Sequence, residues 1–456
     1  YTLDDGADEP DAAVYSKCDL IINGSGTLNV TGNYKDGIKC KDGLRICDCT
    51  INVTSADDGI KGRDYIIIGS GVITVNAYGD GIKTTNSDDS SLGYINIVNG
   101  NINITSAKDA IQAETEFSFN DGTINIYTGS GSASVEHNGS NDFRNPFEMD
   151  SDENAESMKG IKAGTLLQIN GGNITVDSQD DSLHTNGNAV ISGGTLKLST
   201  GDDGIHADEN LTVNGGIITI TLSYEGLEGK SIDINGGTID ITSSDDGMNV
   251  AGGDSGEFFG FNTGDSSEYY ISIAGGSITV NAQGDGIDSN GSVAMSGGNV
   301  VVFGPTDNGN GALDYDASFA LSGGTLIALG SKGMAQAPST LSQPCISIYS
   351  NVDAGAVIEV RNSEGEAVIS VETPKSCQSL IFSSADLTVG ETYTVCADDT
   401  ELTSVTVSDG VSGNGVTGAG NGSFGGDFGG FGDFGGRRDR PDGGDPFGNG
   451  RPDHSD

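Results

Sequence analysis

The sequence is short of tryptophan, proline, histidine and basic residues. It has no Trp, 9 Pro and 4 His in 456 residues, and 21 Lys and Arg stand against 66 Asp and Glu, for a formal charge of −45. Because phosphate binding needs clustered Lys and Arg, nucleic acids and anionic membrane surfaces are poor partners for such a chain. No apolar run reaches membrane-spanning length, so we expect no membrane insertion. No long segment shows the 3.6-residue apolar period of an amphipathic helix, which argues against a globular α/β enzyme.

Glycine, in contrast, is abundant, with 73 residues arranged in a repeat. One copy is DDGIHADENLTVNGGIITIT, from Asp202 to Thr221. A small residue before the first apolar position marks each copy, and the bare interval between markers is 22 residues. The markers are Gly37, Gly59, Gly81, Ala110, Gly160, Ser182, Gly204, Gly226, Gly247, Gly286, Gly311 and Gly333. A fixed period in this range indicates a solenoid, in which each repeat buries its apolar face against its neighbours.

Each repeat holds three short alternating stretches, such as Ile205-x-Ala207, Leu211-x-Val213 and Ile218-x-Ile220. Separated by Gly, Asn and Asp turns, they are typical of strands. The sequence therefore predicts an all-β protein, a right-handed parallel β-helix of about twelve 22-residue coils, with the handedness that parallel connections prefer. We expect an N-terminal cap at 1–16, the β-helix at 17–343, a C-terminal β module at 344–409 and a Gly/Phe/Asp/Arg-rich tail at 410–456. Antiparallel strands are expected in the module at 356–360, 367–371 and 392–395.

Insertions interrupt the repeat at about 129–157 and 251–268. The second insertion carries Phe258, Phe259 and Phe261. Loops on a rigid solenoid are common binding sites, and aromatic rings stack on sugar faces, although packing is the commoner fate of Phe. These three residues are candidates for carbohydrate binding.

Acidic residues recur immediately before the marker, often in pairs. Stacked copies bring carboxylates within a few ångströms of one another, where they repel unless their pKa values rise or a cation lies among them. Ca²⁺ prefers such oxygen-rich, flexible sites, although the spacing is not that of an EF-hand. The alternative is that each Asp accepts backbone N–H groups in its turn. The calcium candidates are Asp57, Asp58, Asp80, Asp180, Asp181, Asp202, Asp203, Asp245, Asp246 and Asp285.

Two residues after the marker, a second row is basic in its N-terminal half and changes sign partway along the chain. This row predicts a strip that binds an anionic or hydroxyl-rich polymer through many weak contacts. The alternative is that its lysines only neutralise the neighbouring aspartates. The candidate binding residues are Lys39, Lys61, Lys83, Lys162, His184 and His206.

The seven cysteines are an odd number, so at least one is unpaired or bonds another chain. Cys18 and Cys40 lie one repeat apart, so stacking of coils could bring them within disulfide reach, and Cys377 with Cys396 is a second candidate pair. The chain begins at Tyr1 and not at Met, so we expect a mature, exported form from which a signal has been removed.

Three features of the sequence occur together in a known protein family. They are the repeated x-Asp-Gly-Ile-(Lys/His) motif, the Asn/Ser-Gly-Gly-(Thr/Asn)-(Ile/Leu)-x-(Val/Ile) turn and strand, and the Gly/Phe-rich tail. Together they resemble the clostridial carbohydrate-binding β-helix family over residues 17–408. The resemblance implies a pectate-lyase-like fold, calcium, binding of cellulose and polygalacturonate, and a secreted or wall-associated protein. The family's calcium sites would map onto the matching pairs 57–58, 180–181, 202–203 and 245–246.

These observations predict an extracellular or cell-surface protein that binds Ca²⁺ and polysaccharide without catalysis. One alternative is a pectate-lyase-like enzyme, whose base would be Lys61, Lys83 or Lys162. The other is the subunit of a filament assembled end to end. Its contacts would be the N-terminal cap, the C-terminal module and the tail, where Phe424, Phe428, Phe431 and Phe434 recur.

Overall fold

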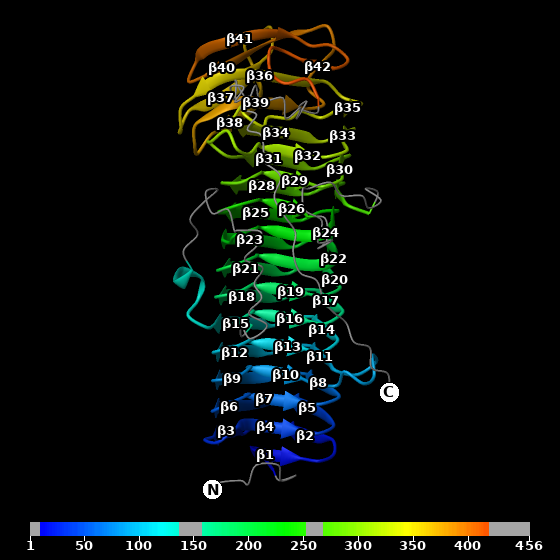
Figure 1. Cartoon of the computed structure of the whole chain (residues 1–456), viewed down its shortest axis with the longest axis vertical. Coiled ribbons are helices and arrows are strands. Elements are labelled where there is room, and N and C mark those ends of the chain that lie inside the picture. Colours follow the sequence, from blue (N-terminus) through cyan, green and yellow to red (C-terminus); the bar gives the residue numbers. More distant parts are fainter. Residues whose placement is uncertain (1–9, 136–156, 252–267, 419–456) are drawn as a thin grey trace, which may run out of the picture. The chain divides into compact units, whose positions relative to one another are not determined.

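The computed structural model describes residues 10–135, 157–251 and 268–418, all within a compact unit of residues 1–420. The candidates Phe258, Phe259 and Phe261 and the Phe-rich tail lie outside the described residues. Short strands stack in parallel, coil upon coil (Figure 1), and form a β-solenoid of about 13 turns. The all-β parallel solenoid expected from the repeat is therefore confirmed.

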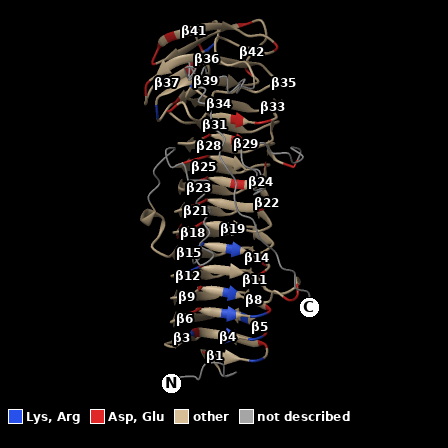
Figure 2. Ribbon diagram, in the orientation of Figure 1, with Lys and Arg blue, Asp and Glu red and all other residues tan. Residues whose placement is uncertain are grey.

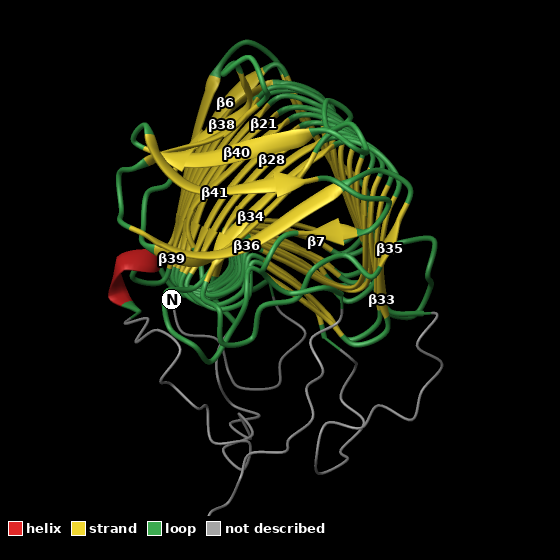
Figure 3. Ribbon diagram, turned by 90° about the horizontal axis from the view of Figure 1, so that it is seen from above, coloured by secondary structure: helices red, strands yellow, loops and turns green. Residues whose placement is uncertain are grey.

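Each coil contributes a strand to three faces, seen along the solenoid axis in Figure 3. The first face contains β1 (Ala12–Ser16), β4 (Asp36–Cys40), β7 (Ile60–Gly62), β10 (Ile82–Thr84), β13 (Ile111–Ala113), β16 (Ile161–Ala163), β19 (Leu183–Thr185), β22 (Ile205–Val213), β24 (Leu227–Ile234), β26 (Met248–Val250), β29 (Ile287–Ser289) and β32 (Leu313–Tyr315). The second face contains β2 (Leu20–Asn23), β5 (Gly43–Cys47), β8 (Tyr65–Ile68), β11 (Tyr94–Ile97), β14 (Glu116–Phe119), β17 (Leu166–Ile169), β20 (Asn188–Ile191), the second halves of β22 and β24, β27 (Tyr270–Ile273), β30 (Ser292–Met295), β33 (Ser318–Leu321) and β35 (Thr340–Leu341).

The third face is a separate sheet. It contains β3 (Thr27–Gly32), β6 (Cys49–Ser55), β9 (Gly71–Ala77), β12 (Asn101–Ser106), β15 (Thr123–Thr128), β18 (Asn173–Ser178), β21 (Thr195–Thr200), β23 (Ile217–Leu222), β25 (Thr238–Ser243), β28 (Ser277–Ala282), β31 (Asn299–Phe303) and β34 (Thr325–Gly330). The first two faces form one 23-stranded sheet, because β22 and β24 each run through the corner between them.

The first strand, β1, lies among the residues expected to form the N-terminal cap. It pairs in parallel with β4, with Ala12 opposite Asp36 and Val14 opposite Ile38. With β2 and β3 it forms a coil before the first recognised marker, Gly37. Its sequence lacks the Asp-Gly signature, so the periodicity alone did not reveal it.

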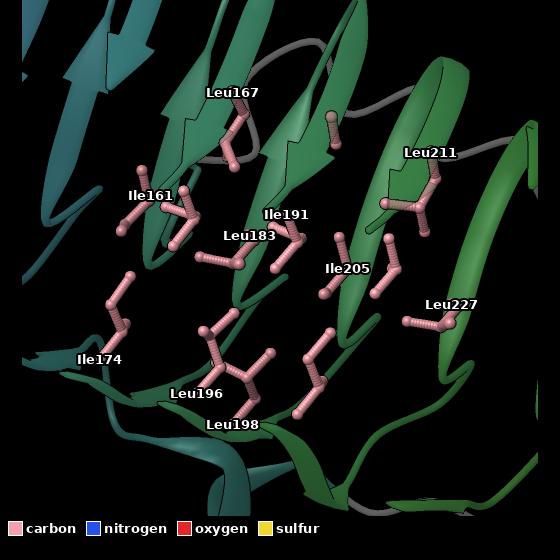
Figure 4. Close-up of a cluster of buried hydrophobic side chains, with 14 of the residues drawn as sticks. Ile161, Leu167, Ile174, Leu183, Ile191, Leu196, Leu198, Ile205, Leu211 and Leu227 are labelled. Atoms are coloured by element: carbon pink, nitrogen blue, oxygen red, sulfur yellow. The ribbon is translucent and has the colours of Figure 1, made fainter. Parts of the chain in front are cut away.

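The core is a set of inward-facing aliphatic stacks (Figure 4). In the first face Leu183, Ile205 and Leu227 occupy equivalent positions on successive strands and are fully buried. Leu196 and Leu198 come from the third face and point into the same core. Each buried aliphatic side chain contributes about 1.5–3 kcal/mol to folding. The period-2 alternation within strands and the 22-residue repeat thus produce one continuous core.

The corner before each first-face strand is tight, which explains the small marker residue. A Cβ added at Gly204 would lie 2.5 Å from the carbonyl oxygen of Gly226 in the next coil and 2.5 Å from Ile220 Cδ1. The turn before the third face has a different requirement, because Gly216 has a φ of 95° that side chains rarely adopt.

The C-terminal segment continues the third face with antiparallel strands. β39 (Cys377–Ser383) pairs antiparallel with β34 and with β36 (Cys345–Val352), whereas β42 (Val411–Ser412) pairs in parallel with β36. A second sheet holds β38 (Ala367–Glu372), β37 (Val357–Arg361), β40 (Thr392–Ala397) and β41 (Thr400–Thr406), all antiparallel. The three antiparallel strands expected here are confirmed. β42 comes from the residues expected to form the tail.

Neither candidate disulfide is present. All seven cysteines are free; Cys18 is exposed, whereas Cys40 is buried and its thiol donates to the carbonyls of Cys18 and Gly43. Although one coil separates the two residues, only Cys40 faces the core. Cys377 and Cys396 lie in different sheets, on β39 and β40. Among the described residues no helix is long and apolar enough to cross a membrane, and η1 (Ser132–Ser134) is a single short turn.

Candidate functional site

The basic row of the sequence forms a ladder on the outside of the first face. Lys39, Lys61 and Lys83 are direct partners on β4, β7 and β10. The same register continues through Gln112, Lys162, His184, His206, Glu228, Asn249, Asp288 and Asp314. We call these residues the mixed ladder. Its charge changes sign along the solenoid, and Figure 2 shows basic residues on the N-terminal strands of this face and acidic residues on the C-terminal ones.

A row made mostly of aspartates stacks beside the mixed ladder, one residue before the markers, and links neighbouring coils. The backbone N–H of Asp80 donates to Asp58 Oδ1 (3.0 Å), and that of Asp109 donates to Asp80 Oδ1 (3.1 Å). The same bond joins Asp203 to Asp181 (3.1 Å) and Asp285 to Asp246 (2.6 Å). In these four cases one carboxylate oxygen accepts a backbone N–H of the neighbouring coil and so holds the two coils together.

In the N-terminal coils the other oxygen of each aspartate binds a lysine. Lys61 Nζ lies 2.6 Å from Asp58 Oδ2, and Lys83 Nζ lies 2.6 Å from Asp80 Oδ2. Burial lowers the pKa of Lys61, but the charge of Asp58 and its hydrogen bond outweigh that effect and raise the pKa overall. Both side chains in each pair are largely buried, so these lysines do neutralise the neighbouring aspartates; that they also bind a polymer stays a prediction.

In the middle coils Lys159, which is not among the candidate residues from the sequence, binds two aspartates of the next coil. Its Nζ lies 2.7 Å from Asp180 Oδ1 and 2.6 Å from Asp181 Oδ2. Although burial opposes the charged form, the two carboxylates raise the pKa of Lys159. His184 Nδ1 also contacts Asp181 Oδ2, at 2.8 Å. Together these contacts hold the pKa of Asp181 below its usual value in spite of its burial.

His206 is surrounded by carboxylates. Its Nδ1 lies 2.6 Å from Glu228 Oε2 and 3.1 Å from Asp203 Oδ2, and its Nε2 lies 3.1 Å from Asp208 Oδ1. Burial lowers the pKa of His206, but the hydrogen bonds to Asp203 and Glu228 raise it to about 11. The same burial raises the pKa of Asp203, and the nearby charges of Asp181 and Asp202 add to that effect.

The C-terminal coils have carboxylates without basic partners. Burial, followed by repulsion from Asp288, Asp285 and Asp245, raises the pKa of Asp246 well above its usual value. The pKa of Asp285 rises to about 7, again chiefly through burial. In the part of the chain that the structure describes, Asp246, Asp285, Asp288 and Asp314 form no ion pair with Lys, Arg or His.

Five groups of side chains bring ligand atoms within 4.8 Å of one another. They are Asp246/Asp285/Asp288, Asp180/Asp181/Asp202, Asp36/Asp57/Asp58, Asp181/His184/His206 and Asp203/His206/Glu228. The first group fits Ca²⁺ well, because it offers carboxylate oxygens that no ammonium group neutralises. In the second group Lys159 already binds Asp180 and Asp181, and in the third group Lys61 already binds Asp58, so each ammonium group would compete with a metal ion. Asp80 and Asp245 belong to none of these groups within the described ranges.

A polar cleft follows the ladders over the N-terminal coils. It has a volume of about 330 Å³ and is lined by Asp57, Asp58, Lys61, Asp80, Lys83, Lys108, Asp109, Gln112, Ser157 and Lys162. A second hollow adjoins it at Lys61 and is lined by Lys39, Cys40, Lys41, Lys61, Arg63 and Thr85. Three of the lysines expected to bind a polymer therefore line one cleft, together with carboxylates and Gln112.

Several residues of the site were not predicted from the sequence, and the structure shows why. In the coil of β32 the marker is Ala312 and not Gly311, because Ile287 pairs with Leu313 and its N–H donates to the Ala312 carbonyl. This one-residue shift hid Asp314. Asp288 and Glu228 belong to the row two residues after the marker, but only the structure shows that they lie beside the aspartate row.

The fold and this site define a class, a parallel β-solenoid with a charged cleft along one face. The family of carbohydrate-binding domain-containing proteins matches the chain twice, over residues 1–204 and 202–410, and the chain belongs to that family. A carbohydrate-binding domain-containing protein of Acetivibrio thermocellus is 44% identical over 130 residues. That match covers 28% of this chain and 46% of the relative, so it spans less than half of the relative's length. No solved structure matches the chain.

Proposed function

We propose that the chain binds a polysaccharide in the cleft lined by Lys61, Lys83, Gln112 and Lys162. Membership of the carbohydrate-binding family, matched over both halves of the chain, carries this proposal. The cleft supports it, because carboxylates accept hydrogen bonds from sugar hydroxyls while ammonium and amide groups donate to sugar oxygens. Equivalent groups recur on successive coils, so a polymer makes many weak contacts that add up to useful affinity.

The proposed ligand is a plant-wall or matrix polysaccharide such as cellulose or polygalacturonate, bound outside the cell or at its surface. Lys162 distinguishes a uronate polymer from a neutral one. It lines the cleft and forms no ion pair in the described part of the chain, so its charge remains for a ligand carboxylate.

A binding assay on insoluble cellulose, xylan and immobilised polygalacturonate tests the proposal. The test variant is the double change Gln112→Ala, Lys162→Gln, and the matched control is Lys197→Gln, an exposed lysine on β21 of the third face. We expect at least about a tenfold weaker retention of the test variant and no change for the control. Retention of no polysaccharide by the wild type, or equal retention of the two variants, would refute the proposal.

We also propose structural calcium at Asp246, Asp285 and Asp288. These residues would hold the ion, whose charge would stabilise the carboxylates that burial and then mutual repulsion disfavour. The alternative calcium positions at 57–58, 180–181 and 202–203 lie beside Lys61, Lys159 and His206, which already supply positive charge.

Two other functions remain as weaker proposals. A lyase needs a neutral lysine as its base, and the raised pKa of Lys61 disfavours that state. Ultraviolet absorbance of an unsaturated product from polygalacturonate would reveal such an enzyme. End-to-end assembly draws support from β1, β2 and β3, each of which pairs with one neighbour among the described strands. Light scattering that gives the monomer mass at tens of micromolar protein would exclude filaments.

A further inference from the structure

The mixed ladder contains two adjacent histidines at the point where its charge changes sign. Lys162 on β16 precedes them, His184 and His206 follow on β19 and β22, and Glu228 on β24 comes next. In the N-terminal coils a lysine of the ladder neutralises the aspartate three residues before it, as Lys83 does for Asp80. At these two coils imidazole groups stand in that place. Imidazole, unlike ammonium, offers a lone pair to a metal ion.

We propose that His184, His206, Asp203 and Glu228 form a site for a borderline divalent cation of the Zn²⁺ class. The ring centroids of His184 and His206 lie 4.9 Å apart, as stacking on neighbouring strands requires. Ligand atoms of the two histidines lie within 4.8 Å of each other and of an Asp181 oxygen, and those of Asp203, His206 and Glu228 meet the same limit. His206 belongs to both groups and is the centre of the site.

The surroundings of His206 match those of a metal-bound imidazole. Its Nδ1 faces Glu228 and Asp203, the two carboxylates of the site, while its Nε2 faces Asp208 at 3.1 Å. A histidine that binds a metal through one nitrogen usually donates its other N–H to a carboxylate, which fixes the ring's orientation. In the metal-free state both nitrogens carry protons, since both face acceptors. A bound cation replaces the proton on Nδ1.

Burial and charge also suit a dication. The side chains of His206 and Glu228 are 23% and 20% exposed, so an ion reaches them from solvent, whereas that of Asp203 is only 9% exposed. Asp181 is already neutralised by Lys159, so it need not bind the ion. Its contact with Nδ1 of His184 holds that ring in place.

The ligand set selects a different ion from the one proposed at Asp246, Asp285 and Asp288. Two imidazoles with two carboxylates favour Zn²⁺, Co²⁺, Ni²⁺ or Cu²⁺, whereas an all-carboxylate set favours Ca²⁺. The two sites therefore respond to different metals.

Titration of the tag-free full chain with Co²⁺, after chelator treatment, tests the proposal. We expect a visible Co²⁺ absorption band that saturates at one ion per chain. Zn²⁺ abolishes this band, and a large excess of Ca²⁺ leaves it unchanged. Absence of the band, or its loss on adding Ca²⁺, would overturn the proposal.

The decisive variant is His206→Lys, which copies the chain's own Lys61 and Lys83 coils and keeps the positive charge beside Asp203. We expect it to fold, to lose the band and to bind Zn²⁺ more than about tenfold more weakly. Glu228→Gln is nearly isosteric and reports on the site if His206→Lys does not fold. The matched control changes the other two histidines, His137 and His454, to Asn and keeps the band. A band that survives in both His206→Lys and Glu228→Gln, or disappears in the control, would place the ion elsewhere and refute the site.

Discussion

Lys83 Nζ lies 2.6 Å from Oδ2 of Asp80, whose other oxygen accepts the backbone N–H that begins the next coil. One buried carboxylate thus joins two coils and holds one lysine. Burial raises the pKa of Asp80, and Lys83 is the largest influence that opposes this rise. The pair therefore belongs to the framework of the solenoid as well as to the wall of the cleft.

Removing the lysine should destabilise the fold by leaving a buried carboxylate unpaired. We expect Lys83→Met to lower the free energy of unfolding by about 1–3 kcal/mol at pH 7. The pKa of Asp80 is already raised and would rise further, so this cost is present above the folded pKa. It disappears as pH falls through the raised folded pKa of Asp80 in the wild type, below which this carboxyl is protonated in both folded proteins. Urea unfolding at several pH values measures it. The control Asp80→Asn, Lys83→Met should recover most of the loss, and a pH-independent loss would contradict this explanation.

The substitution Asp246→Asn should raise Tm without calcium and should cost stability relative to the wild type when calcium is present. Without metal, burial and the neighbouring carboxylates disfavour its charged form, so Asp246→Asn should raise Tm in EDTA. With millimolar Ca²⁺ the wild type should gain several degrees by mass action, and the variant should gain little. The matched control Asp240→Asn, an exposed site on β25, should behave as the wild type in both conditions. Equal Tm values for the wild type with and without Ca²⁺ would exclude structural calcium.

Lys375 supplies a pH dependence unrelated to metals. It donates to the carbonyl of Ala282, and burial lowers its pKa to about 8. Below pH 8 the lysine is protonated in both states, and its burial costs stability in full. Between pH 8 and the unfolded value of 10.5 the unfolded chain binds more protons, so stability rises with pH.

Lys375→Met should therefore raise the free energy of unfolding at pH 7 by on the order of 2 kcal/mol. The difference from the wild type should shrink as the pH approaches 10.5. Chemical unfolding of both proteins at matched pH values measures this difference. A constant difference across that range would show that the amine is not responsible.

The residues just beyond Asp409 should matter for stability. Val411 and Ser412 in β42 pair with Cys345 and Ile346, and the carbonyl of Gly418 accepts the N–H of Ala337. A chain that ends at Asp409 loses these bonds. We expect it to be about 1–3 kcal/mol less stable than a chain that ends at Gly418. Thermal unfolding compares the two. Identical Tm values would show that β42 contributes nothing.

The repeat in the sequence by itself determines the architecture. In a solenoid each residue contacts its equivalents one period away, so the 22-residue interval predicted the pairing of Lys39 with Lys61 and of His184 with His206. The same rule predicted which rows of side chains would stack. It failed for β1, which lacks the Asp-Gly signature, and at Ala312, where a loop shifts the marker by one residue.

The partners of the stacked side chains were decided by the tertiary structure. A period brings Cys18 and Cys40 to neighbouring coils, but the direction of each side chain keeps the thiols unbonded. Asp80 and Asp285 look alike in sequence, yet Asp80 binds Lys83, whereas the charged neighbours of Asp285 are all carboxylates, which separates an ion pair from a candidate calcium site. Such differences depend on burial and on contacts of a few ångströms between coils, which the spacing of residues along the chain does not contain.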